Sequence, residues 1–173
     1  MEIAGIRTES FEDGLGIRTV IFFQGCTHYC YHCQNPHTWG FGDGKEVNIQ
    51  YLLNIIEQDE LSTGVTFSGG CPFCAENLDE IILLAKEIKM RGYNIWSYCG
   101  ENIDDLNNKQ LELLQYIDVL IDGQYIDELR DDTLAFRGSS NQRIIDVKNY
   151  YLKGENKNSK SLNTAILDLN DAN

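Results

Sequence analysis

The chain has few basic residues and no long apolar run. Lysine and arginine number 14 against 27 acidic residues, which gives a formal net charge of −13. Because phosphate backbones are held by clustered Lys and Arg side chains, and no basic run occurs here, we expect no nucleic-acid partner. No window reaches the roughly 20 apolar residues of a membrane helix, so no membrane partner is expected. Residues 1–7 lack the layout of a signal peptide, and we expect a cytoplasmic protein.

The composition is otherwise that of an ordinary globular protein. The 173 residues are 42% hydrophobic and 24% charged, which suffices for one domain with a hydrophobic core. No internal repeat is evident. Beyond Lys153 the sequence is polar and rich in asparagine. This pattern predicts a domain over residues 1–153 and a loosely ordered tail over residues 154–173.

Strand patterns alternate with helix patterns along the chain. The apolar periodicity predicts strands over residues 18–23, 64–67, 94–98 and 118–121, and helices over residues 49–58, 78–88 and 104–116. Such alternation implies right-handed crossovers and a parallel sheet, whose ligand sites lie at the carboxyl ends of the strands. Residues 25–47 show no sustained period, which predicts a long functional loop directly after the first of these strands.

Six cysteines are present. In a reducing compartment, their spacing indicates a metal-binding or redox site before it indicates disulfides. Cys26, Cys30 and Cys33 lie close together at the start of the predicted loop. Structural zinc takes four closed ligands, whereas an iron-sulfur cluster held by three cysteines leaves one iron open to an exogenous ligand. The spacing therefore predicts a 4Fe-4S cluster bound by these three thiolates.

A zinc-stabilised interaction module without catalysis is the alternative. His28, His32 or the pair Cys71 and Cys74 could complete a zinc site with the three-cysteine loop, but the gap between the two CxxC pairs far exceeds the usual zinc-ribbon spacing. The Cys71–Cys74 pair is interpreted either as two small apolar residues or as a reversible redox pair. Cys99 stands alone at a predicted strand end, where a cysteine is more often simply buried.

The cysteine spacing, with Gln24-Gly25 before it and Asn35 after it, resembles the signature of the radical S-adenosylmethionine (SAM) superfamily. Further segments resemble the activating proteins of anaerobic ribonucleoside-triphosphate reductases, and the resemblance covers about residues 2–147. These segments are Asp13–Arg18, Phe23–Cys26, Cys33–Trp39, Thr66–Gly70, Asp122-Gly123 and Phe136–Arg143. The ordered set is much more specific than the cysteine spacing alone.

The resemblance implies an α/β fold, a truncated, open parallel (β/α) barrel of the radical SAM type. It also implies an activity, in which a reduced cluster cleaves SAM and the resulting 5'-deoxyadenosyl radical removes a hydrogen from a glycine of the reductase. The implied partners are the large subunit of anaerobic ribonucleotide reductase and a low-potential electron donor such as flavodoxin or ferredoxin. An activator of another glycyl-radical enzyme, such as pyruvate formate-lyase, is the alternative within this class. No catalytic residue is expected beyond the cluster ligands, because the key step needs no proton transfer.

The resemblance further assigns contacts with SAM. The residues expected to bind it are His32, Cys33, Gln34, Ser68, Gly69 and Gly70. A planar ring at the first of these positions suits the adenine, and the glycines would let backbone approach the SAM amino group. Cys71 stands where family members usually carry an acidic residue, so a carboxylate that would help hold the ammonium group is missing. The polar segment 136–143 is expected to be an exposed loop that meets the reductase.

Overall fold

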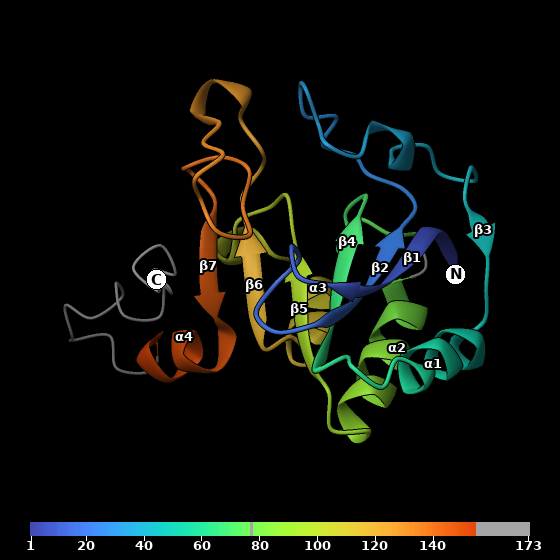
Figure 1. The fold of residues 1–173 in the computed structure, drawn as a ribbon. Helices are drawn as coiled ribbons and strands as arrows, with labels where there is room; N and C mark the ends of the chain where they lie inside the picture. Colours follow the sequence, from blue (N-terminus) through green and yellow to red (C-terminus); the bar gives the residue numbers. More distant parts are fainter. Residues whose placement is uncertain (77, 155–173) are drawn as a thin grey trace.

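A seven-stranded sheet organises the computed structural model, which describes residues 1–76 and 78–154 (Figure 1). Its strands are β1 (Glu2–Ser10), β2 (Arg18–Phe23), β3 (Lys45–Glu46), β4 (Gly64–Gly69), β5 (Asn94–Tyr98), β6 (Val119–Asp122) and β7 (Arg143–Asp146). The order across the sheet is β3-β1-β2-β4-β5-β6-β7. The pairs among β2, β4, β5 and β6 are parallel, whereas β1, β3 and β7 pair antiparallel. The predicted parallel sheet is confirmed for these four central strands.

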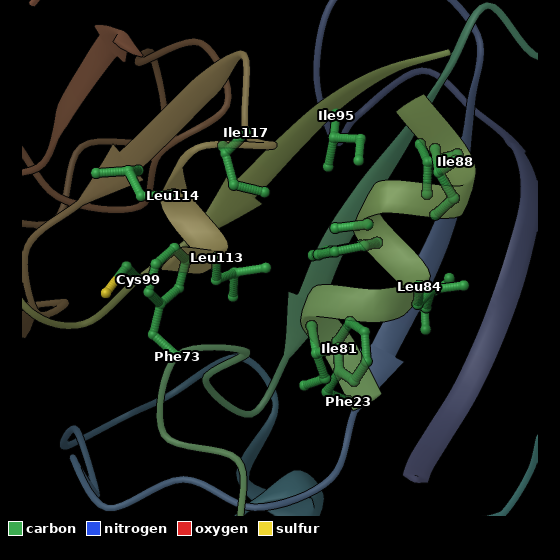
Figure 2. Close-up of a cluster of buried hydrophobic side chains, with 14 of the residues drawn as sticks. Phe23, Phe73, Ile81, Leu84, Ile88, Ile95, Cys99, Leu113, Leu114 and Ile117 are labelled. Carbon is green, nitrogen blue, oxygen red and sulfur yellow. The ribbon is translucent and has the colours of Figure 1, made fainter. Parts of the chain in front are cut away.

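Helices cover the main core on one side of the sheet. The helices are α1 (Ile49–Gln58), α2 (Leu78–Met90), α3 (Asn108–Leu114) and α4 (Val147–Gly154). The connecting loops contain the 3-10 turns η1 (Pro36–Thr38), η2 (Ile103–Asp105) and η3 (Asp127–Leu129). Ile81, Leu84 and Ile88 recur along one face of α2 and point into the core with Phe23 and Ile95 (Figure 2). This spacing of three to four residues is the amphipathic pattern that predicts the helix from sequence.

The opposite face of the sheet carries a smaller cluster. Trp96, Ile121 and Ile144 are buried there, and Phe136 packs edge-on against the Trp96 ring with centroids 5.4 Å apart. The guanidinium of Arg18 lies over the same ring, 5.4 Å from its centroid. The central strands are therefore buried on both faces, which explains their near-continuous apolar sequences.

The single helix predicted over residues 104–116 is wrong. The structure divides this segment into η2 and α3, because Asn107 begins a new helix. Its side chain accepts hydrogen bonds from the N–H groups of Lys109 and Gln110, and the Gln110 side chain accepts one from the Asn107 N–H. This reciprocal capping box defines the helix start and excludes one continuous helix.

The long loop predicted over residues 25–47 also contains short regular pieces, η1 and β3. Residues 155–173, which make up nearly all of the predicted tail, lie outside the described residues. Among the described helices, none combines the length and apolar character needed to cross a membrane. The loops that follow β2 and β6 rise from the same edge of the sheet, where the candidate site lies (Figure 1).

Candidate iron-sulfur site

A cavity of about 500 Å³ opens at the carboxyl edge of the parallel strands. Cys26, Cys30 and Cys33 all line it, together with Gln34 and the segment Ser68–Gly70. The cavity thus brings together seven of the eight residues that the sequence assigned to the cluster and to SAM. Its position follows the rule that open α/β sheets bind ligands beyond the carboxyl ends of their strands.

The base of the cysteine loop is closed by backbone hydrogen bonds. The Gly25 N–H donates to the Thr38 carbonyl at 2.8 Å, and the Cys26 N–H donates to the Trp39 carbonyl at 3.1 Å. These bonds hold the first cysteine beside the chain that leaves the loop. The loop is therefore anchored at both ends before any cofactor binds.

Within the loop, the backbone turns tightly, and all three cysteines line one cavity. The Cys33 N–H donates to the Cys30 carbonyl at 3.1 Å. Tyr29 and His32 have positive φ angles of 46° and 54°, a conformation uncommon outside glycine. The Asn35 N–H donates to the Cys33 sulfur at 3.3 Å, and hydrogen bonds to ligand sulfurs are among the factors that set cluster potentials.

The donor set fits an iron-sulfur cluster. Burial raises the pKa of the Cys26 thiol to about 11, and nearby Cys74, Cys30 and Cys33 raise it further by repulsion. A bound metal ion compensates such repulsion, because its positive charge deprotonates a coordinating thiol outright. Three thiols on one loop, beside a cavity with room for a further ligand, match a cluster that keeps one iron open.

Gly69 and Gly70 allow the β4–α2 loop to pack against the cysteine loop. The N–H of Gly70 donates to the Phe23 carbonyl at 2.9 Å, and the N–H of Cys71 donates to the Gly25 carbonyl at 3.0 Å. A Cβ atom on Gly70 would lie 2.2 Å from the Gly25 oxygen. A glycine is therefore needed at position 70 so that the two loops can pack closely. The approach of this backbone to SAM stays a prediction.

His32 lies apart from the other predicted SAM contacts. Its ring stacks on Tyr31 with centroids 3.9 Å apart, and its Nδ1 is 2.9 Å from a carboxylate oxygen of Asp127. The side chain is 59% exposed, and His32 is absent from the described residues that line the cavity. Hydrogen bonds from Tyr125 and then His32 lower the pKa of Asp127. The predicted contact of His32 with adenine stays a prediction.

The segment 136–143 differs from the exposed loop that the sequence suggests. Within it only Ser140 and Asn141 are exposed, and Ser139 is fully buried. The Gln142 side chain accepts hydrogen bonds from the N–H groups of Gly138 and Ser139, at 2.9 and 3.2 Å, and donates to the Gly123 carbonyl at 3.1 Å. The expectation of an exposed loop is wrong, because Gln142 folds the segment over the end of β6.

Arg137 is a cavity residue that sequence reasoning missed. Its side chain lines the cavity, and one terminal nitrogen donates to the Gln142 carbonyl at 3.0 Å. Its Nε is buried and has no hydrogen-bond partner among the described residues. No local sequence signal separates this arginine from an ordinary surface charge, since its role depends on how the segment folds back.

A second group of soft ligands adjoins the cysteine loop. The Cys74 sulfur is 3.4 Å from His28 Nε2 and accepts a hydrogen bond from the Thr27 hydroxyl at 3.4 Å. A hydrogen bond from the Cys71 thiol, followed by those from His28 and Thr27, lowers the pKa of Cys74 to about 4. The pKa of Cys71 is raised well above its ordinary value by contacts with the thiols of Cys74 and Cys99 and by burial.

The fold and the three-cysteine cavity define an iron-sulfur protein. In agreement, a family model described as a 4Fe-4S single cluster domain matches residues 12–145. Comparison with curated proteins gives the particular family. The chain is 36% identical to the anaerobic ribonucleoside-triphosphate reductase-activating protein of Haemophilus influenzae, over 76% of this chain and 89% of that protein. The chain belongs to the family of anaerobic ribonucleoside-triphosphate reductase-activating proteins.

Other relatives of the same name agree. The identity is 34% to the protein of Escherichia coli K12, over 76% of this chain and 90% of the relative. It is 37% to that of Enterobacteria phage T4, over 78% of this chain and 86% of the relative. Among solved structures, QueE from Escherichia coli matches with a TM-score of 0.50 and 16% identity, over 70% of each chain. At that identity the likeness concerns the fold alone.

Proposed function

We propose that this chain is a radical SAM activase that generates a glycyl radical on anaerobic ribonucleoside-triphosphate reductase. The observation that carries the proposal is the placement of Cys26, Cys30 and Cys33 on one cavity at the carboxyl edge of the sheet, in a member of the reductase-activating family. When bound and reduced, a 4Fe-4S cluster supplies one electron to the sulfonium of SAM, and the released 5'-deoxyadenosyl radical abstracts hydrogen from a glycine.

The chain's own residues would hold and orient the cofactors. Cys26, Cys30 and Cys33, which line the cavity, would bind three irons of the cluster and leave the remaining iron open to a further ligand. Ser68–Gly70 presents backbone to the amino acid part of SAM. Arg137 offers a cation on the same cavity wall, and a guanidinium pairs well with a carboxylate. We assign it to the SAM carboxylate.

The remaining expectations form part of the same proposal. We interpret the sheet, whose edge strands β3 and β7 lie at opposite ends of the order, as a truncated barrel, and its open side would admit a glycine-bearing loop. The partners are the large subunit of the reductase and a low-potential electron donor of the flavodoxin or ferredoxin type, in the cytoplasm. Because the key step is electron transfer followed by hydrogen-atom abstraction, the chain needs no general acid or base.

Anaerobic reconstitution with iron and sulfide tests the proposal. The reduced protein, given SAM, is expected to form 5'-deoxyadenosine and methionine, and to generate a glycyl radical signal on added reductase. Cys30→Ala is expected to abolish both products. Cys74→Ala is the matched control, because it removes a thiol that is absent from the residues lining the cavity, and it is expected to keep cleaving SAM. A wild-type protein that holds a cluster but cleaves no SAM would overturn the proposal.

A further inference from the structure

Three soft ligand atoms converge beside the cysteine loop without belonging to the cluster set. His28 Nε2 and the sulfurs of Cys71 and Cys74 all lie within 4.8 Å of one another. The sulfur of Cys74 is 3.4 Å from the histidine nitrogen. Zinc takes sulfur at about 2.3 Å and nitrogen at about 2.0–2.1 Å, so tetrahedral angles place such a pair about 3.5 Å apart. The observed separation therefore suits a shared ion with little movement.

The backbone holds the two cysteines in a closed turn. The Cys74 N–H donates to the Cys71 carbonyl at 2.9 Å, which closes the turn. The Cys71 N–H donates to the Gly25 carbonyl at 3.0 Å, which ties the turn to the cysteine loop. Phe73, between the two cysteines, is part of the buried core, as is Cys99 (Figure 2). The turn is thus anchored by its own side chains.

Packing also fixes the orientation of His28. A Cβ atom on Gly100 would lie 2.3 Å from ring atom Cδ2 of this histidine, so the ring rests directly on the glycine backbone. The Gln124 side chain donates to the His28 carbonyl at 3.1 Å. A ligand whose ring is already oriented loses less conformational freedom when it binds a metal ion.

We propose that His28, Cys71 and Cys74 bind one zinc ion, at a second site that adjoins the cysteine loop, since His28 and Cys71 also line its cavity. Two thiolates and an imidazole are a donor set that favours zinc, whereas magnesium and calcium prefer oxygen ligands. The thiol of Cys99 is buried and in contact with Cys71. The ion would join the cysteine loop, through His28, to the loop after β4. The inference stands on these contacts alone and does not depend on the proposed reaction.

Metal analysis of the full chain tests this site. The protein is produced in zinc-supplemented medium, purified anaerobically, reconstituted with iron and sulfide, dialysed, and analysed for both metals. We expect about one zinc and about four irons per chain in the wild type. The double variant Cys71→Ser/Cys74→Ser is expected to lose the zinc and keep the iron. The triple variant Cys26→Ser/Cys30→Ser/Cys33→Ser is expected to lose the iron and keep the zinc.

The reciprocal variants separate a failure of this site from a failure of the cluster. His28→Gln provides a second test that leaves every cysteine in place, and it is expected to lower zinc content as the double variant does. Wild-type protein without zinc would overturn the inference. It would also be overturned if zinc were lost on replacing Cys26, Cys30 and Cys33 but kept on replacing Cys71 and Cys74. Recovery of a Cys71–Cys74 disulfide from the anaerobically purified protein would also overturn it, in favour of a redox pair.

Discussion

Arg143 donates hydrogen bonds from two nitrogens to the buried carboxylate of Asp122. Its Nε donates to one carboxylate oxygen at 2.9 Å, and a terminal nitrogen donates to the other. Asp122 is fully buried at the end of β6, and it also accepts a hydrogen bond from the Ile103 N–H at 2.8 Å. The pair therefore joins β6, β7 and the start of η2, so Arg143 has a structural role and is not a free docking charge.

Arg143→Met is expected to destabilise the fold. The substitution leaves the Asp122 carboxylate buried without its cation, and because Arg143 is 30% exposed the cost is expected to fall below the roughly 3–5 kcal/mol of a fully buried pair. Urea denaturation measures the loss as a lower midpoint. Arg130→Met is the control, because Arg130 pairs with Asp132 at the surface and its loss is expected to leave the midpoint unchanged. Adding Asp122→Asn to Arg143→Met is expected to restore part of the stability, and no recovery would contradict this account.

Gly70→Ala is expected to disturb the cluster loop. The added Cβ would lie 2.2 Å from the Gly25 oxygen, so the two loops must separate or the backbone must shift. Overpacking of this kind costs about 1–3 kcal/mol. The measurements are iron bound per chain after reconstitution and the urea midpoint, both of which should fall. Gly5→Ala is the control, since nothing lies within 4 Å of its added Cβ. Full iron content in the Gly70 variant would count against this packing role.

The central elements could be predicted because their patterns are strong. The ranges predicted for β2, α1 and β5 coincide with the observed Arg18–Phe23, Ile49–Gln58 and Asn94–Tyr98. Strands buried on both faces give short apolar runs, and a helix packed on one side gives a period of 3.6 residues. These signals are local, so they can be read from the sequence without tertiary information.

The edge strands and the contact between His28 and Cys74 could not be predicted in this way. Strand β1 is half exposed, and its register against β2 shifts between Ile3 and Gly5 and between Arg7 and Ser10, so no clean alternation is visible. Cys26, Cys30 and Cys33 are neighbours in sequence, so their spacing alone predicts them as a set. His28 and Cys74 are 46 residues apart, and only the folded chain brings them together.

Arg137→Ala is expected to weaken SAM binding. Loss of a hydrogen bond to a charged group costs about 1.5–3 kcal/mol, which corresponds to a roughly 10- to 150-fold higher Kd. Equilibrium dialysis of SAM against the cluster-loaded protein measures this change. Arg91→Ala is the control, because Arg91 pairs with Glu57 and Glu87 at the end of α2 and its loss should not alter the Kd. An unchanged Kd together with lost reductase binding would contradict this assignment and indicate that Arg137 contacts the reductase.

The pH dependence of cysteine alkylation is expected to separate Cys74 from Cys26 in the reduced, metal-free chain. The pKa of Cys74 is lowered to about 4 by its hydrogen bonds, so this thiol is ionised throughout pH 6–8 and its alkylation rate should be flat. The pKa of Cys26 is raised to about 11 by burial. Its thiolate fraction, and hence its rate, should increase about tenfold per pH unit over the same range, because only the thiolate reacts.

Mass spectrometry of peptides after timed exposure to iodoacetamide measures both rates in one sample. Thr27→Ala serves as an internal test, because it removes one hydrogen bond to the Cys74 sulfur and leaves the contacts with Cys71 and His28. When the rates are followed down to pH 3, the variant should show the lower edge of the flat region at higher pH, since the thiolate is less well stabilised. A Cys74 rate that climbs with pH as steeply as that of Cys26 would mean that the contacts do not stabilise a thiolate in solution.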